Sequence, residues 1–329
     1  MLAGSLPPEP CGVGIFLSRL SEELRKKGVE ILLASRRGKP DVPFSPTALF
    51  WRKVQEFRPD ILHLHYPGKA FRYSLFPFRL PEWHPRLLTL YEYRLAHPLR
   101  RAIARRIAQH CDAIIFPSGW ERDAFPVKEK PTWVIPVFPL FSSISQRESS
   151  EYSPHFFFLG LWDKSKDFRF LQEAIKMGMK EGMVPTFTVY SLDRERAQKW
   201  RAKFPRQFQK RIVVDAIRDL REATERFSPG SVALLPFRDG CSLRRTSLLS
   251  LLALGIPVIS FPPLEPPLQS GEGILPVRTV EEFLTVAQRV REEKFYREQS
   301  EKARQVARYF TPEYIAEQYL SVYNNFRKQ

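Results

Sequence analysis

Hydrophobic positions in the first half of the chain alternate between helical and strand spacing. Phe16, Leu17, Leu20 and Leu24 recur at helical spacing, which predicts an amphipathic helix that ends at Gly28. Between the later strand segments the chain is long enough for crossover helices, so the pattern predicts a parallel sheet. The predicted strands of this half are residues 29–34, 61–64, 87–90 and 113–116.

The second half repeats this alternation after a polar connector. Residues 142–154 (SSISQRESSEYSP) contain few apolar side chains, which predicts a domain boundary. The sequence therefore predicts an α/β protein with two doubly wound, Rossmann-like domains, residues 1–145 and 154–329, whose strand ends face a central cleft. The predicted strands of this half are residues 155–159, 186–190, 232–235 and 257–261.

Composition supports a folded protein of about two domains, since the chain has 329 residues, 43% hydrophobic and 27% charged. No apolar run is long enough to span a membrane, and no secretory signal is visible, so we expect a cytoplasmic protein. Three widely separated cysteines predict reduced thiols. The 52 basic and 36 acidic residues give a net charge of +16, which favours anionic partners.

A polar turn followed by an apolar helix forms the strongest local signal, in residues 238–260. Thr246 or Ser247 can cap this helix, and its exposed N–H groups would lie beside Arg244 and Arg245. This arrangement predicts an anion site suited to a diphosphate. Alternatively, the two arginines solvate the helix start or pair with acidic side chains.

The order of these parts resembles the glycosyltransferases of the GT-B fold, above all the family-4 group. The glycine-containing loop and the strand RPDILHLH resemble segments of that group's first domain, and the helix-to-strand junction ALGIPVIS resembles a segment of its second. The resemblance extends over nearly the whole chain, to closing helices at its end. The segments that carry it are residues 7–14, 58–65, 113–118, 158–166, 253–260 and 309–320.

This resemblance implies transfer of a sugar from a nucleoside diphosphate sugar to an acceptor hydroxyl, without a metal or other cofactor. Positive charge and a helix start would stabilise the departing diphosphate. The acceptor would be a glycan or a lipid-linked molecule in the assembly of cell-surface glycans. The implied donor-binding residues are Gly12, Lys166, Gly240, Ser242, Arg244, Arg245 and Ser250.

Several positions depart from the family pattern. Where the family has an arginine before its Lys-Gly pair, this chain has Asp163 before Lys166 and Asp167. Two glutamates of the family correspond to Ser242 and Ser250, whose hydroxyls bind more weakly than carboxylates. These departures indicate either an altered donor site or a catalytically silent homologue that binds a sugar nucleotide or a glycan.

Tyr91 and Glu92 are the candidate catalytic residues, because a histidine of the family corresponds to Tyr91. A phenol with a pKa of about 10 is a poor base at neutral pH, so Glu92 is the better candidate. The alternative is that Glu92 pairs with Arg94 or another surface arginine.

Two histidines and one cysteine have both a chemical and a structural interpretation. His63 and His65 share one face of a strand, which is compatible with metal binding, but no third ligand is evident, and we favour a neutral pair. Cys11 beside Gly12 is either reactive or a buried thiol.

Two basic segments bear on the acceptor. Residues 69–80 mix aromatic and cationic side chains, and residues 100–108 place arginines on a helical arc. Peripheral contact with an acidic membrane is one interpretation, and a solvated arginine face is the other. Nucleic-acid binding would also suit the charge, but no dedicated motif is present, so no nucleic-acid partner is expected.

Overall fold

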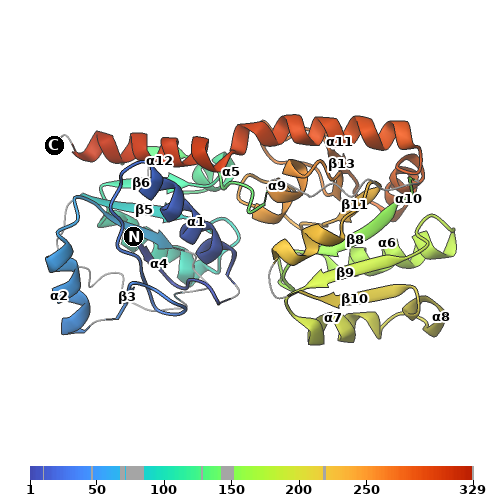
Figure 1. Ribbon diagram of the computed structural model, residues 1–329, viewed down its shortest axis with the longest axis horizontal. Helices are drawn as coiled ribbons and strands as arrows, with labels where there is room; N and C mark the ends of the chain where they lie inside the picture. The colour runs from blue at the N-terminus through green and yellow to red at the C-terminus, as the bar shows by residue number, and fades with distance from the viewer. Residues whose placement is uncertain are drawn as a thin grey trace. The chain divides into compact units, whose positions relative to one another are not determined.

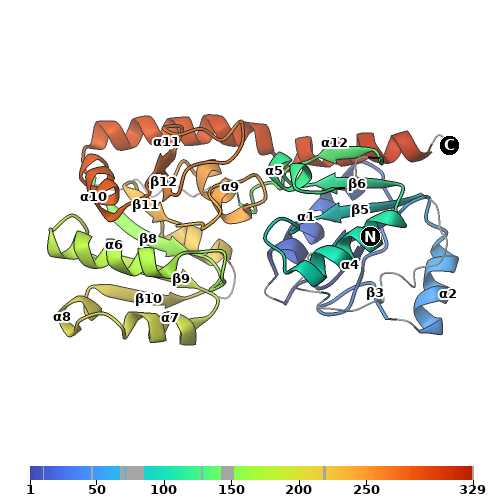
Figure 2. The ribbon, with the colours of Figure 1, turned by 180° about the vertical axis from the view of Figure 1, so that it is seen from behind.

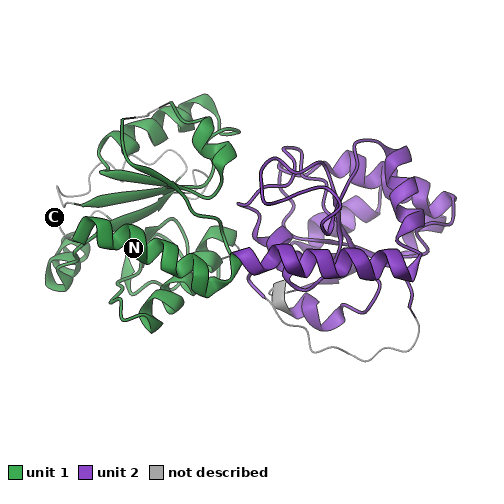
Figure 3. Cartoon of the chain, turned by 90° about the horizontal axis from the view of Figure 1, so that it is seen from above, with its two compact units in different colours: residues 1–138, 310–329 green, residues 139–309 purple. Residues whose placement is uncertain are grey.

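The computed structural model describes residues 1–9, 11–45, 47–66, 71, 85–126, 129–141, 152–217 and 220–327. The chain forms two compact units (Figure 3). Unit 1 comprises residues 1–138 and 310–329, and unit 2 comprises residues 139–309. This division differs from the predicted domains 1–145 and 154–329, because the C-terminal segment returns to unit 1.

Unit 1 contains a seven-stranded parallel sheet in the order β3-β2-β1-β4-β5-β6-β7 (Figure 1). Its strands are β1 (Leu2–Ala3), β2 (Ala34–Ser35), β3 (Val42–Pro43), β4 (Leu62–Tyr66), β5 (Arg86–Leu90), β6 (Ala113–Phe116) and β7 (Thr132–Val134). The predicted strand at 29–34 was wrong over most of its length. Regular pairing begins only at Ala34, because the neighbouring strand β1 offers just Leu2 and Ala3 as partners.

Helices cover both faces of this sheet, and β4 shows why. Side chains alternate along a strand, so Leu62, Leu64 and Tyr66 pack in one core with helices α2 and α4, while His63 and His65 lie on the opposite face. On that opposite face α12 packs against α1 (Figure 1). The helices of unit 1 are α1 (Gly12–Lys26), α2 (Ala48–Phe57), α4 (Pro98–Gln109), α5 (Gly119–Asp123) and α12 (Pro312–Arg327).

Unit 2 contains a six-stranded parallel sheet in the order β10-β9-β8-β11-β12-β13 (Figure 2). Its strands are β8 (His155–Leu159), β9 (Phe187–Ser191), β10 (Ile212–Ala216), β11 (Ser231–Leu234), β12 (Val258–Ser260) and β13 (Ile274–Pro276). Its helices are α6 (Phe168–Lys180), α7 (Arg194–Arg201), α8 (Arg206–Gln209), α9 (Thr246–Ala253), α10 (Val280–Arg289) and α11 (Glu293–Ala307), with 3₁₀ turns η2 (Leu220–Arg226) and η3 (Arg308–Phe310), the latter passing into unit 1.

Both sheets are doubly wound, as the sequence predicted. The chain moves outward from β1 in one direction and from β4 in the other, and it does the same from β8 and β11. In such sheets, ligands bind beyond the carboxyl ends of the strands at the point where the order reverses. The loops that follow β8 and β11 are therefore the first place to look for a site in unit 2.

Candidate functional site

The loops after β8 and β11 are joined by backbone hydrogen bonds. The Asp167 N–H donates to the Pro236 carbonyl at 2.8 Å, and the Arg238 N–H donates to the Ser165 carbonyl at 2.9 Å. The polar side chains on these two loops consequently gather at the topological switch point of unit 2.

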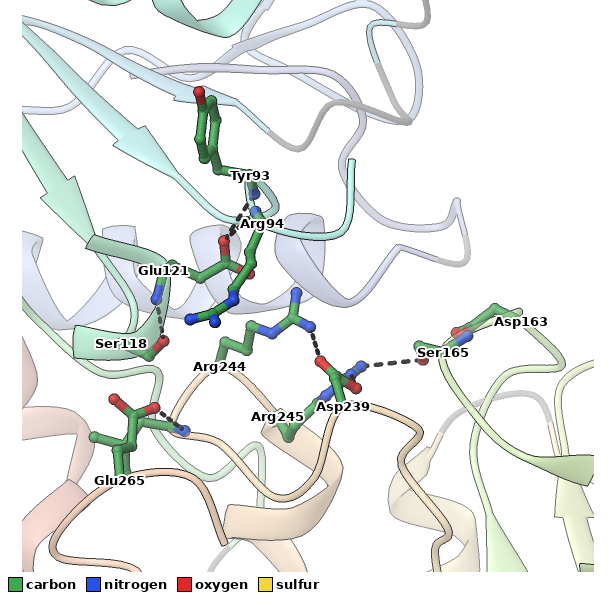
Figure 4. A network of polar contacts seen from close by, with 11 residues as sticks. Tyr93, Arg94, Ser118, Glu121, Asp163, Ser165, Asp239, Arg244, Arg245 and Glu265 are labelled. Carbon is green, nitrogen blue, oxygen red and sulfur yellow. Dashed lines mark hydrogen bonds and ion pairs between the residues drawn. The ribbon is translucent and has the colours of Figure 1, made fainter. Parts of the chain in front are cut away.

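Asp239 holds the two adjacent arginines of the second loop. Its carboxylate forms ion pairs with both Arg244 and Arg245, and Arg245 also donates from Nη1 to Ser165 Oγ at 3.1 Å (Figure 4). The three charged side chains are only 2%, 8% and 13% exposed. Burial, reinforced by Arg244, lowers the pKa of the Arg245 guanidinium. Of the two interpretations of these arginines, pairing with an acid is therefore present in the structure.

Lys166 brings a third buried cation to the same cluster. Its Nζ donates to the Leu161 carbonyl at 3.1 Å and to the Asp163 carboxylate at 3.2 Å. Asp163 also accepts the Ser165 N–H at 2.7 Å, which fixes the turn that carries the lysine. We call Asp163, Lys166, Asp239, Arg244 and Arg245 the cation cluster. Its three cations and two carboxylates leave one net positive charge.

Helix α9 starts immediately after this cluster. Arg245 is its N-cap and has an extended backbone, without a side-chain hydrogen bond to the helix. The prediction that Thr246 or Ser247 caps the helix was wrong, because Thr246 is already helical and the ion pair with Asp239 holds Arg245 at the cap position. The predicted end of the helix is confirmed, since Gly255 has a φ of +71°.

The remaining donor-site candidates of unit 2 have distinct surroundings. Ser250 Oγ donates to the Thr246 carbonyl at 2.6 Å and accepts the Leu140 N–H at 2.8 Å, so both of its hydrogen-bonding capacities serve the fold. Ser242 is buried, and its Oγ has no hydrogen-bond partner among the described residues. Gly240 has a φ of +75°, and a Cβ there would lie 2.5 Å from the Pro262 carbonyl oxygen, so the turn itself requires glycine.

In unit 1, Tyr91 belongs to a buried cluster on the α12 face of the sheet. Its hydroxyl lies 2.9 Å from His65 Nδ1, while His63 bridges Tyr323 and Thr89 at 2.7 and 2.8 Å. We call this set the histidine–tyrosine cluster; its members are His63, His65, Thr89, Tyr91, Tyr319 and Tyr323. Sequence reasoning missed the two tyrosines of α12, although their spacing of one helical turn was a usable signal.

Burial sets the protonation of this cluster. It lowers the pKa of His65 to about 3 and holds the pKa of His63 well below its usual value, with the neighbouring His65 adding to the effect. Burial also raises the pKa of Tyr91 well above its usual value, so the phenol is a weaker acid than in solution. No group of three or more potential metal ligands occurs in the part of the chain that the structure describes. The favoured interpretation of a neutral histidine pair agrees with these contacts.

Glu92 follows Tyr91 and is half-buried, at the start of a loop that a second acid positions. Glu121 is fully buried, and its carboxylate accepts the N–H groups of Tyr93 and Arg94 at 2.8 and 2.9 Å (Figure 4). The predicted cap of α5 is confirmed in part, because Ser118 Oγ accepts the Glu121 N–H at 3.2 Å, but the glutamate side chain serves the loop after β5 instead. Sequence reasoning missed this role.

Gly12 begins α1 directly after Cys11, whose backbone is extended and whose side chain forms no cap. The loop before it is tightly packed, since a Cβ at Gly14 would lie 2.4 Å from the Ser5 carbonyl oxygen. Gly12 thus lies at the start of a long helix next to the reversal point between β1 and β4. The basic segment 69–80 lies outside the described residues except for Phe71, a buried core residue.

Comparisons with known proteins agree with this architecture. The model of the family described as Glycosyltransferase Family 4 matches residues 38–137. A glycosyltransferase from Rickettsia africae ESF-5 is 11% identical with a TM-score of 0.73, over 100% of this chain and 98% of that chain. WaaG, a glycosyltransferase involved in lipopolysaccharide biosynthesis, is 10% identical with a TM-score of 0.67, over 98% of this chain and 99% of that chain. No functionally curated protein matches the sequence significantly.

TarM is similar over a smaller share of its own length. It is 13% identical with a TM-score of 0.61, and the match covers 84% of this chain but only 58% of TarM. The chain therefore spans little more than half of that protein. Taken together, the sheets and the structural matches define a GT-B fold, which confirms the resemblance found in the sequence. Its family-4 match lies within unit 1.

The membrane question has a limited answer from the helices. In the part of the chain that the structure describes, no helix combines the length and the apolar content needed to cross a bilayer.

Proposed function

We propose that this protein transfers a sugar from a nucleoside diphosphate sugar to an acceptor hydroxyl. The observation that supports this most directly is the cation cluster, which lies on two loops at the switch point of the second sheet. Doubly wound sheets bind nucleotides at such points, and buried arginine and lysine side chains recognise phosphates well. The GT-B fold supports an enzyme of the glycosyltransferase type.

In this proposal, unit 2 binds the donor and stabilises the leaving diphosphate. Lys166, Arg244 and Arg245 supply positive charge, and the start of α9 supplies N–H groups with the positive end of a helix dipole. The Ser242 hydroxyl, buried and without a partner among the described residues, is available to hydrogen-bond a donor. Stabilisation of charge that develops on a leaving group lowers the activation free energy of transfer. We propose that no metal ion is required.

For the acceptor, we propose Glu92 as the general base, because the raised pKa of Tyr91 makes that phenol unsuitable. We further propose an acceptor in cell-surface glycan or glycolipid assembly and a cytoplasmic location. Two similar proteins support that class of acceptor: WaaG takes part in lipopolysaccharide biosynthesis, and S. aureus TarM has been crystallised with UDP and α-GlcNAc-glycerol.

A catalytically silent binder of sugar nucleotides or glycans is a second candidate. It is favoured by Ser250, which occupies a family glutamate position but uses its hydroxyl to link α9 to the Leu140 N–H. Asp239 also offsets part of the charge that a diphosphate would meet. Such a protein would bind nucleotide without releasing sugar.

Calorimetric titration with UDP, GDP, ADP, dTDP and pyrophosphate tests the donor site. Lys166→Gln and Arg244→Gln should each weaken binding by roughly tenfold or more, since hydrogen bonds to charged groups contribute about 1.5–3 kcal/mol. Arg238→Gln is the matched control, because this neighbouring side chain is 58% exposed. Ser242→Ala leaves the charges in place and serves if a charge variant fails to fold.

Transfer and hydrolysis of diphosphate sugars are then followed with the best nucleotide. Sugar release that persists in a chelator and falls with Glu92→Gln supports metal-independent transfer. Binding without release supports the silent binder. Equal affinity in wild type, Lys166→Gln and Arg244→Gln would remove the cation cluster from the donor site and contradict the proposal.

A further inference from the structure

Helix α4 and the turn before it carry positive charge without neighbouring acid. Residues 93–111 contain five arginines and no aspartate or glutamate. The helix packs on the sheet through Ile103, Ala104, Ile107 and Ala108, which leaves its opposite side toward solvent (Figure 2). The charge of this segment therefore lies on the surface of unit 1.

Exposed apolar side chains lie next to these arginines. Leu95 is 58% exposed and Leu99 is 52% exposed, which places them among the few large hydrophobic residues on the surface of the described chain. They are four residues apart, one in the turn and one in the first turn of α4. We call Arg94, Leu95, Leu99, Arg101, Arg105 and Arg106 the α4 surface.

The arginines of this surface are not committed to internal ion pairs. Within the described residues, Arg101 and Arg105 have no acidic partner, Arg106 donates to Gln109 at 3.2 Å, and Arg94 lies over the Trp120 ring at 4.5 Å. By contrast, exposed arginines on other helices do have acidic partners, such as Arg169 with Glu173 on α6. The unbalanced charge is thus a local property of α4.

We propose that the α4 surface docks unit 1 on a bilayer rich in anionic lipid. Arginines attract the anionic headgroups, and Leu95 and Leu99 enter the boundary between headgroups and acyl chains. Exposed leucines distinguish this surface from one that binds a polyanion, for which charge alone is sufficient. The apolar face of α4 stays in the core, so contact is peripheral. Docking extends the proposed function toward lipid-borne acceptors but does not require a working donor site.

Vesicle sedimentation without nucleotide tests docking independently of transfer. The full chain is mixed with phosphatidylcholine vesicles that contain or lack phosphatidylglycerol. We expect retention on the anionic vesicles, release as salt rises, and little retention on phosphatidylcholine alone. No retention on anionic vesicles at low salt overturns the proposal, whereas loss of nucleotide binding does not affect it.

Two variants separate the contributions. R101S/R105S should reduce partitioning roughly 25-fold, because each basic residue near an anionic membrane contributes about fivefold. L95S/L99S keeps the net charge and should also reduce retention severalfold. The control R169S/R297S removes the same charge from two exposed ion pairs of unit 2 and should bind like wild type. All of these positions are at least partly exposed, so the variants are expected to fold.

A single-stranded oligonucleotide provides the competing outcome. Equal retention of R101S/R105S and R169S/R297S shows that overall charge, not the α4 surface, attracts the vesicles, and overturns the proposal. If L95S/L99S binds vesicles like wild type and R101S/R105S loses oligonucleotide and vesicles alike, the surface recognises polyanions and the lipid assignment is wrong.

Discussion

The buried histidines of unit 1 should make its stability sensitive to pH between 7 and 5. Folding lowers the pKa of His65 to about 3 and that of His63 well below its usual value, mainly through burial. In the unfolded chain both titrate near 6.5. The neutral form is therefore favoured in the folded state, and the stability it confers is present above pH 6.5 and is lost as pH falls toward the folded-state pKa.

The magnitude follows from the width of that window. Below pH 6.5, each histidine reduces the free energy of unfolding by about 1.4 kcal/mol per pH unit, which amounts to roughly 2 kcal/mol at pH 5. Together His63 and His65 should cost about 4 kcal/mol, a large part of the stability of a typical domain. His155 in unit 2 has a lowered pKa for the same reason, so the comparison of variants has to isolate the unit 1 pair.

Urea denaturation at pH 7, 6 and 5 measures this dependence. H63Q/H65Q should be less stable than wild type at pH 7, because ring contacts with α12 are lost, but its stability should fall less steeply with decreasing pH. His97→Gln is the control, since this histidine is exposed and should leave the steep dependence intact. A wild-type stability that is flat over this range, or an unchanged slope in H63Q/H65Q, would refute the reasoning.

Three further predictions concern individual residues. Gly240→Ala should lower the free energy of unfolding by about 1–3 kcal/mol, because a Cβ meets a backbone carbonyl, whereas Gly182→Ala has open space and should cost about 1 kcal/mol; equal melting temperatures would contradict this. Ser250→Ala should cost about 1–3 kcal/mol in chemical denaturation by leaving the Leu140 N–H without its partner, and a stability within error of wild type would argue against that link. Under native conditions a thiol reagent should modify Cys11 first, because burial raises the pKa of the other two cysteines to about 12; rapid reaction of all three thiols would be inconsistent with the structure.

The sequence determined the fold class through local patterns. Apolar runs such as residues 113–116 and 155–159 became central strands, because a strand covered by helices on both faces needs continuous apolar side chains. The glycine stop at Gly255 and the serine cap at Ser118 are equally local, since backbone conformation and one hydrogen bond decide them. These features require no knowledge of distant parts of the chain.

Tertiary structure alone decided which side chains meet. Asp239 pairs with Arg244 and Arg245 across a turn, and Glu121 serves a loop far from it in sequence, because carboxylates buried by folding bind the nearest donors. The return of α12 to unit 1 depends on contacts between Tyr323 and His63, which lie 260 residues apart. Local propensity carries no information about such pairs. The sequence identified the candidate positions, but packing determined their charge balance and protonation.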